Sequence, residues 1–312
     1  MERILRKRTE PVVAIDAAPV VISVMSSSAG SPAIDGLRIR PMRPDEIAIA
    51  VNWAAAEGWN PGLADDVCFA AADQGFFIGE FEGAPAATVS CINYGAGFAF
   101  LGFYIVREDL RGRGFGLRIW NAAIAHAGSR VIGLDGVAAQ QQNYRKSGFE
   151  LAYANVRYGG TVTPPDAPPA GVIALTEVPL AAIEVYDATV FPAPRTAFLR
   201  AWIGSSGHLG CAIVRDGRLA GWGVIRPCRK GRKIGPLVAD DRATAELILS
   251  ALLADVGGGE IFLDVPGVNR DGIALAQDLG LARVFETARM YTGAIPPLRL
   301  ERIFGVTTFE LG

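Results

Sequence analysis

The chain has 312 residues, about half of them hydrophobic, and a formal net charge of −2. A chain of this length can bury more than one core and commonly forms about two domains. Because the charge is nearly balanced and no basic block dominates, composition argues against binding to nucleic acid or to an anionic membrane surface.

The cysteine and histidine content limits which metal sites and which cellular compartments are compatible with the sequence. The four cysteines show no CxxC spacing, and the chain contains only two histidines. This pattern argues against a zinc site and predicts buried, reduced thiols in a cytoplasmic protein. No apolar stretch reaches the roughly 18 residues that a membrane-spanning helix needs.

Residues 1–36 are predicted to form a disordered N-terminal extension. A basic start and an apolar run from Pro19 to Met25 imitate a signal peptide, but Glu10, Pro11 and Asp16 interrupt the apolar region. We therefore do not expect an export signal. Whether residues 1–24 belong to the natural protein stays open, because Met25 could serve as a start.

Residues 37–160 have the pattern of an α/β domain with a mixed sheet. An alternating strand at Leu37–Pro41 precedes a helix that starts near Arg43, and a hairpin follows. The expected elements after the first strand are a helix to about residue 56, the hairpin at 75–93, a central strand at 98–106, a helix ending at Gly128, a strand at 131–135, a helix around Tyr144 and a strand to Tyr158.

The same order of elements returns after a proline-rich linker, predicted at residues 161–170. Matching positions lie roughly 130 residues apart, which indicates an internal duplication. A hairpin at 207–224, a strand at 233–238, a helix at 243–253 and a strand at 260–264 repeat the first copy. We therefore predict a second domain at 171–312, with a separate mixed sheet flanked by helices in each copy.

The loop after the central strand of the first copy has the features of an anion-binding site. It runs Arg111-Gly-Arg-Gly-Phe-Gly116 between an apolar strand and a helix. Glycines at such a turn let backbone N–H groups converge, and the unpaired N–H groups of the helix start add positive potential, so the loop suits a diphosphate. It lacks the Gly-Lys-Ser/Thr of a P-loop and the third glycine of a dinucleotide fingerprint.

This Arg-x-x-Gly-x-Gly loop, together with Tyr144 four residues before Gly148-Phe149, resembles the GNAT superfamily of N-acetyltransferases. The resemblance implies two tandem GNAT folds and acetyl-CoA as co-substrate, without a metal. The implied CoA contacts are Phe103, Tyr104, Ile105 and Val106 along the pantetheine arm and Arg111, Gly112, Arg113, Gly114, Phe115 and Gly116 at the diphosphate. The family's asparagine is replaced by Val137, so Asn143 becomes the candidate CoA contact in that helix.

The two copies differ at the loop and at the tyrosine. Copy 2 has no glycine at residues 239–244, and Asp240 and Asp241 would repel a diphosphate. The position that matches Tyr144 is Ala276. We therefore predict a cofactor site in the first copy and a degenerate second copy that contributes to the acceptor pocket.

Tyr144 and Asp135 are the candidate catalytic residues. By its position in the family motif, Tyr144 would protonate the departing thiolate, although it could instead only pack against the sheet. Asp135 ends an apolar strand, where a carboxylate must be paired or used, and is the candidate base for the amine. Its alternative is a structural partner of an arginine, and its repeat equivalent Asp264 supports that alternative.

Trp59 and Asn60 fall in the segment that forms one wall of the acceptor site in the family, although a tryptophan there can also belong to the core. The basic run at 226–233 is expected to be a solvated loop. The expected function is acetyl transfer from acetyl-CoA to a primary amine of a small molecule by direct attack. The alternative is a non-catalytic acyl-CoA-binding sensor or assembly protein, and a homodimer is compatible with either. The identity of the acceptor is not readable from the sequence.

Overall fold

The computed structural model describes residues 36–72 and 74–312, so the predicted N-terminal extension lies outside the described residues except for Gly36. The strands are β1 (Arg38–Pro41), β2 (Phe76–Phe81), β3 (Ala84–Tyr94), β4 (Phe98–Val106), β5 (Val131–Val137), β6 (Glu150–Val162), β7 (Ile173–Ala174), β8 (Leu209–Arg215), β9 (Arg218–Pro227), β10 (Arg232–Ala239), β11 (Gly259–Pro266), β12 (Ala282–Tyr291) and β13 (Ile303–Gly305). The α-helices are α1 (Ile47–Ala56), α2 (Asp65–Ala70), α3 (Phe115–Ala127), α4 (Gln141–Lys146), α5 (Leu180–Asp187), α6 (Thr196–Gly204), α7 (Arg242–Val256) and α8 (Arg270–Asp278).

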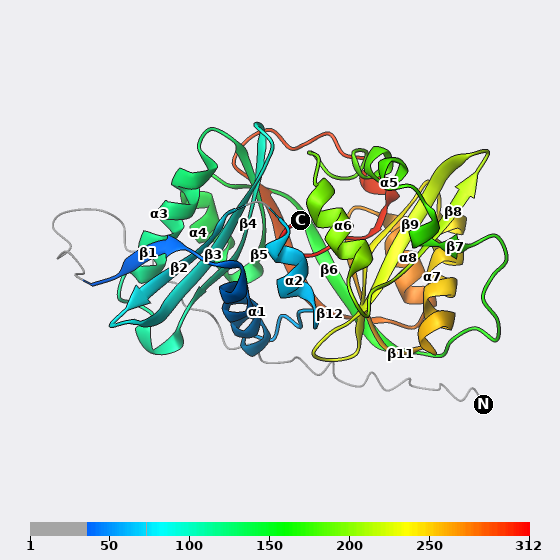
Figure 1. The fold of residues 1–312 in the computed structure, drawn as a ribbon, viewed down its shortest axis with the longest axis horizontal. Helices are drawn as coiled ribbons and strands as arrows, with labels where there is room; N and C mark the ends of the chain where they lie inside the picture. The colour runs from blue at the N-terminus through cyan, green and yellow to red at the C-terminus, as the bar shows by residue number, and fades with distance from the viewer. Residues whose placement is uncertain (1–35, 73) are drawn as a thin grey trace, which may run out of the picture.

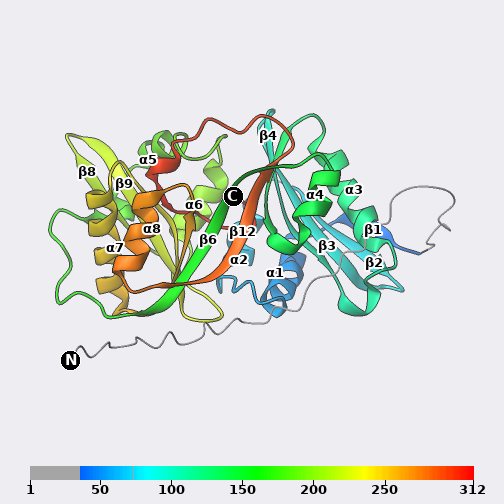
Figure 2. The same ribbon diagram turned by 180° about the vertical axis from the view of Figure 1, so that it is seen from behind.

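The two copies share one mixed sheet, which corrects the prediction of a separate sheet in each copy. Within the described residues the strand order is β1-β2-β3-β4-β5-β12-β6-β11-β10-β9-β8-β7, and β13 pairs with β10. The last strands of the copies are exchanged: β12 pairs antiparallel with β5, and β6 pairs antiparallel with β11. In Figures 1 and 2, β6 and β12 cross the centre of the molecule side by side and join its two halves.

Strand β6 continues past the predicted end of the first domain. Gly159 and Gly160 pair with Phe262 and Ile261 of β11, and the strand ends only at Val162. A Cβ at Gly159 would lie 2.8 Å from the Phe262 ring, so the glycine allows that ring to lie over the strand. These glycines therefore serve the strand exchange, and the irregular connection begins after Val162.

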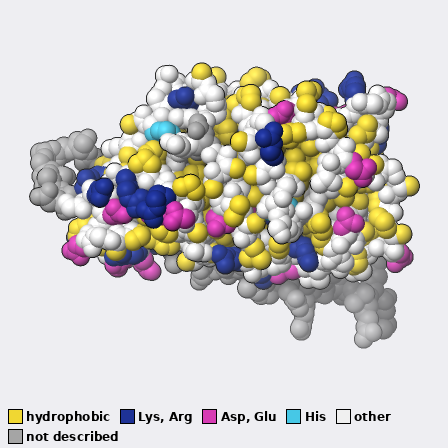
Figure 3. Space-filling model, in the orientation of Figure 1, with side chains coloured by type: hydrophobic (Ala, Val, Ile, Leu, Met, Phe, Trp, Pro, Cys, Tyr) yellow, Lys and Arg dark blue, Asp and Glu magenta, His cyan; other side chains and the backbone are white. Residues whose placement is uncertain are grey.

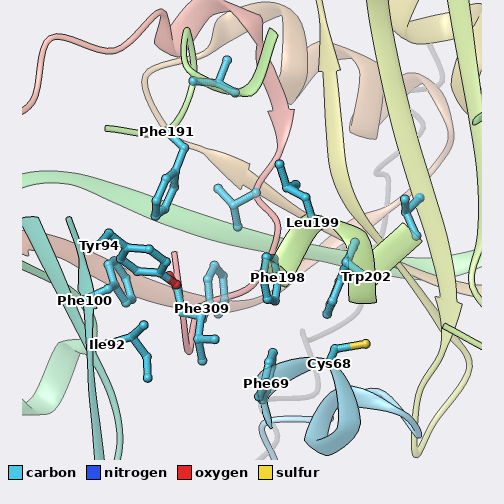
Figure 4. Close-up of a cluster of buried hydrophobic side chains, with 14 of the residues drawn as sticks. Cys68, Phe69, Ile92, Tyr94, Phe100, Phe191, Phe198, Leu199, Trp202 and Phe309 are labelled. Atoms are coloured by element: carbon cyan, nitrogen blue, oxygen red, sulfur yellow. The ribbon is translucent and has the colours of Figure 1, made fainter. Parts of the chain in front are cut away.

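Helices cover both faces of the sheet. Helices α3 and α4 pack on the first copy and α7 and α8 on the second, and each pair covers its own core (Figure 2). On the other face, α1, α2, α5 and α6 pack into one core that draws residues from both copies. Figure 4 shows part of this shared core, where Phe69 of the first copy lies near Phe198 and Trp202 of the second, and Tyr94 lies near Phe191. Burial across this core holds the two copies together.

The C-terminal tail, residues 306–312, is buried between the copies (Figure 1). The Tyr94 hydroxyl donates to the Leu311 carbonyl at 3.0 Å, and Arg195 donates to the Gly312 carbonyl at 3.0 Å. Phe309 and Leu311 pack into the shared core. The tail is thus a structural element of the interface between the copies.

The basic run at 226–233 is solvated only in its middle, where Arg229 and Lys230 are exposed, whereas its two ends are buried. Arg226 is fully buried and donates to Asp65 at 2.9 Å, and Lys233 is also buried. Between them, the Asn60 amide donates to the Lys230 carbonyl at 3.0 Å and accepts from the Lys230 N–H at 2.9 Å. The positive charge of Arg226 can be buried here because α2 supplies the Asp65 carboxylate from the other copy.

All four cysteines are free and buried, as predicted. No helix within residues 36–72 and 74–312 is long and apolar enough to span a membrane. Over the same ranges, no group of three or more His, Cys, Asp or Glu side chains could hold a metal ion. On the face shown in Figure 3, basic and acidic side chains are interspersed among apolar and uncharged ones.

Candidate active site

The glycine loop forms the predicted turn into α3. Gly112 and Gly114 have φ values of 77° and 81°, a left-handed conformation that glycine adopts without strain, and Gly114 is the N-cap of α3. No side chain of the described chain caps this helix, so its first N–H groups stay available. The backbone therefore offers a diphosphate several donors and the positive end of the helix dipole.

The arginines around the loop have two roles: one holds the loop in position, and the other adds positive charge. Arg111 donates to the Val106 carbonyl at 3.0 Å and forms an ion pair with Glu57 of the segment after α1. Arg113 is exposed and stacks on the Phe81 ring, 4.6 Å from its centroid. Arg111 thus fixes the loop against β4, while Arg113 adds positive charge at its surface.

A pocket lies between β4 and β5; residues 111–116 do not line it, but Glu57, the ion-pair partner of Arg111, does. The parallel pairing of the two strands ends at Leu101 and Leu134, and β4 bulges at Phe103, whose φ is 48°. The pocket encloses about 770 Å³ including its solvent-open mouth. Its lining includes the predicted pantetheine contacts Phe103, Tyr104 and Ile105, although Val106 lies outside it. A gap between two strands beyond a bulge leaves backbone groups that an amide-containing chain can pair with.

Tyr144 lines this pocket from α4. Its ring lies flat over Gly136 of β5, where a Cβ would come within 2.3 Å of the ring, and stacks on Trp120 at a centroid distance of 5.6 Å. Burial raises the pKa of the Tyr144 phenol above its usual value, so the hydroxyl keeps its proton at neutral pH. The residue therefore packs against the sheet and also presents a protonated hydroxyl at the pocket.

Asp135 lies at the same pocket, but its carboxylate is fully engaged. Arg289 of β12 donates to both of its oxygens at 3.0 and 2.6 Å, and Asn155 donates at 2.7 Å. The repeat equivalents form the matching pair, with Arg157 of β6 donating to Asp264 at 2.6 and 2.8 Å. Both pairs cross between the copies and connect the exchanged strands, which favours the structural alternative for Asp135.

Of the remaining predicted site residues, Trp59 lines the pocket, whereas Asn60 and Asn143 lie outside its lining. Trp59 lines the pocket, and its carbonyl accepts from Arg157 at 2.8 Å. Asn60 does not line it, because its amide is bound to Lys230. Asn143 also lies outside the lining but donates to Gln140, which lines it, at 2.7 Å.

The second copy contributes residues that sequence reasoning missed. Phe285 and Thr287 of β12 and Phe309 and Glu310 of the tail line the pocket. Local sequence carries no signal for them, because only the strand exchange and the course of the tail bring them to β4. The pocket is therefore built by both copies.

The equivalent site in the second copy is closed. Asp241 caps α7 by accepting from the Thr244 N–H at 2.7 Å, so a carboxylate of the chain already occupies the helix start. The gap between β10 and β11 is filled by β13, which pairs with Leu237 and Val238, and the Val306 N–H donates to the Asp264 carbonyl at 2.8 Å. Both routes by which copy 1 could hold CoA are thus blocked in copy 2.

This contrast predicts the effect of removing the acidic cap. Asp241→Ala should lower the free energy of unfolding by about 1 kcal/mol, because an N-cap bond is lost, and should leave CoA affinity unchanged. Urea unfolding and calorimetric titration with CoA measure the two quantities. A change in CoA affinity would contradict the closed state of copy 2, and Glu246→Ala, on the exposed face of the same helix, serves as control.

Comparison with known proteins agrees with this geometry. The sequence profile of the acetyltransferase (GNAT) family matches residues 44–149, and that of an acetyltransferase (GNAT) domain matches residues 183–305. A holothin acyltransferase from Pseudoalteromonas sp. (strain SANK 73390) is 32% identical over 275 residues, which cover 88% of this chain and 94% of the relative.

Solved structures share the fold over most of the chain. A proposed acetyltransferase from Pyrococcus horikoshii has a TM-score of 0.76 at 23% identity, covering 92% of this chain and 100% of that one. A tandem GNAT protein from the clavulanic acid biosynthesis pathway has a TM-score of 0.57 at 17% identity, covering 83% and 99%. The chain therefore belongs to the GNAT acetyltransferase family and is an acyltransferase with two tandem GNAT domains.

Proposed function

We propose that the chain transfers an acetyl group from acetyl-CoA to a primary amine of a small molecule by direct attack. The observation that carries the proposal is the asymmetry of the two copies. The first has an uncapped glycine turn and a pocket between β4 and β5, whereas in the second Asp241 and β13 occupy the equivalent places. Residues 111–116 would hold the diphosphate, and Phe103, Tyr104 and Ile105 would line the pantetheine arm.

In the proposed reaction the acceptor ammonium first loses a proton, and its nitrogen then attacks the thioester carbonyl carbon. The C–N bond forms, the C–S bond breaks, and Tyr144 protonates the departing thiolate. The second proton of the amine returns to Tyr144 through solvent, so the phenol is restored. Backbone N–H groups at the β4 bulge would stabilise the carbonyl oxygen as its charge develops.

The acceptor end of the pocket favours an apolar amine. Trp59, Phe285 and Phe309 line it, and their rings suit an aromatic or hydrophobic acceptor better than a sugar. The similarity to a holothin acyltransferase makes holothin the first acceptor to test. Acyl-CoA thioesters of increasing chain length should be compared in the same assay, because that relative is described only as an acyltransferase.

Tyr144→Phe tests the enzyme against the alternative of an acyl-CoA sensor. The substitution keeps the ring and its stacking on Trp120, so CoA affinity should stay within about twofold. Turnover should fall about 100-fold, which is the size of a general-acid contribution. Calorimetry with CoA measures the affinity. A thiol-release assay with a panel of candidate acceptor amines, holothin among them, measures the turnover.

Tyr153→Phe is the matched control, because it removes a buried phenol from β6 outside this pocket. It should leave turnover unchanged. Tight CoA binding by the unaltered chain without transfer to any amine would instead support the sensor.

A further inference from the structure

Glu310 is a buried carboxylate of the C-terminal tail that lies at the proposed acceptor site. It is only 3% exposed and lines the pocket together with Phe309. Its backbone crosses β4 directly over Gly102, where a Cβ would come within 2.2 Å of the Glu310 carbonyl oxygen. Gly102 immediately precedes the Phe103 bulge, so the tail contacts the strand beside the predicted position of the pantetheine arm.

The residues around Glu310 hold it in place. The Leu311 N–H donates to the Thr308 hydroxyl at 2.9 Å, and the Leu311 carbonyl accepts from Tyr94. On the other side, the Phe309 ring lies 5.0 Å from the guanidinium of Arg157. Glu310 thus lies between two anchored residues, which fixes its position at the edge of the gap between β4 and β5.

Glu310 and Tyr144 line the same pocket. Tyr144 lies over Gly136 of β5 and Glu310 crosses over Gly102 of β4, so the two residues lie on the two strands that border the pocket. Each close approach depends on a glycine, since a Cβ would clash with the Tyr144 ring or with the Glu310 backbone. A phenol and a carboxyl group thereby belong to two residues that line one cavity.

The carboxylate of Glu310 differs from its acidic neighbours because it has no direct partner. Asp264 is paired with Arg157 and Asp65 with Arg226. Across residues 36–72 and 74–312, no hydrogen bond or ion pair to the Glu310 side chain is present. Its oxygens are also not among the fully enclosed, unpartnered polar atoms of the described chain.

The charges around Glu310 balance when it and Lys233 are both ionised, and also when both are neutral. Three cations and three carboxylates share this buried region: Asp65, Arg157, Arg226, Lys233, Asp264 and Glu310. Burial raises the pKa of Glu310, opposed by Lys233, while Asp65 adds to the increase and Arg157 and Arg226 lower it. A carboxylate whose pKa is raised by burial and which has no direct partner binds a proton more tightly than a free glutamate, and is therefore a stronger base.

Resting on the proposed function, we infer that Glu310, and not Asp135, is the base that accepts the proton of the acceptor ammonium. The proton moves from the ammonium nitrogen to a carboxylate oxygen of Glu310, and the freed lone pair attacks the thioester carbonyl carbon. Glu310 then releases the proton to solvent through the pocket mouth. The second domain therefore supplies a catalytic group to the cofactor site of the first.

Glu310→Gln tests this role, because it keeps the size of the side chain and removes the base. With an aliphatic amine found in the acceptor screen, kcat/KM at pH 7 should fall about 100-fold. The deficit should shrink as the pH approaches the pKa of that amine, because the acceptor then arrives already deprotonated. With hydroxylamine, which is largely neutral at pH 7, the deficit should stay below about threefold after subtraction of the uncatalysed reaction.

Two controls separate a base from a structural carboxylate. Glu310→Asp keeps a carboxylate and should recover part of the lost turnover, while Glu301→Gln removes an exposed acid of the same segment and should have no effect. CoA affinity and melting temperature, measured for each variant, show whether the fold is retained.

An equal loss for Glu310→Gln with both acceptors and at every pH would overturn the inference. Unchanged turnover by Glu310→Gln would also overturn the inference. In that case, loss of activity in Tyr144→Phe would still support the proposed function. If the unaltered chain transfers acetyl to no amine, the proposed function fails and this inference fails with it.

Discussion

Gly112→Asp should abolish CoA binding, with the dissociation constant rising at least about 100-fold. The position has φ of 77° and free space around a Cβ, so an aspartate fits without a clash. It would, however, place a carboxylate in the turn that is proposed to hold the diphosphate. Two like charges about 5 Å apart at an effective dielectric constant of about 20 repel by roughly 3 kcal/mol, which corresponds to a factor of about 100.

Gly112→Asn is the matched control, because asparagine has the same shape and the same tolerance of this backbone conformation. It should weaken CoA binding less than tenfold. Isothermal titration with CoA at fixed salt measures both variants. Equal affinities for the two variants would show that the turn does not hold the diphosphate, as would a crystal soaked with CoA in which the nucleotide lies against residues 239–247.

Asp135→Asn should lower the free energy of unfolding by about 3–5 kcal/mol. The substitution leaves the buried Arg289 guanidinium without a negative partner, and an uncompensated buried charge is strongly destabilising. Because the pair joins β5 to β12, the loss should also weaken the strand exchange between the copies. Urea denaturation followed by circular dichroism and by tryptophan fluorescence measures the change.

The double variant Asp135→Leu with Arg289→Met should be more stable than either single variant, because it removes both charges together. Asp264 and Arg157 form the equivalent pair, although Arg157 also lines the pocket, so Arg289 is the cleaner partner to replace. If the Asp135→Asn protein were stable and its kcat/KM no longer fell at low pH, Asp135 would instead be the catalytic base.

Local sequence was sufficient to predict the features that depend on backbone conformation. The order of strands and helices, the duplication and the turn at Gly112 and Gly114 were all predictable, because hydrophobic periodicity and glycine conformation act over a few residues. The degenerate loop was predictable for the same reason, since Asp241 lies at the start of its own helix. Tyr144, singled out by its place in the motif, lines the pocket, and its role as the acid stays a prediction.

The sheet was not predictable, because strand exchange is a choice between two equivalent partners. Strand β6 could pair with β5 of its own copy or with β11 of the other, and both pairings satisfy the same alternation of side chains. Arg157 and Arg289 each find an aspartate only across the exchange. This long-range pairing makes Asp135 an ion-pair partner, although its sequence context looks like that of a base.

By itself, then, the sequence determined that the chain contains two GNAT-like units, that only the first has an uncapped glycine turn, and that Tyr144 follows at the family's spacing. Only the tertiary structure decided that β13 closes the second unit and that the tail brings Glu310 to Gly102 of the first. The physical reason is the range of the interactions. Turns and helix starts depend on neighbouring residues, whereas the charged groups that act on Glu310 (Asp65, Arg157, Arg226 and Lys233) lie more than 70 residues away in the sequence and are brought near it only by the fold.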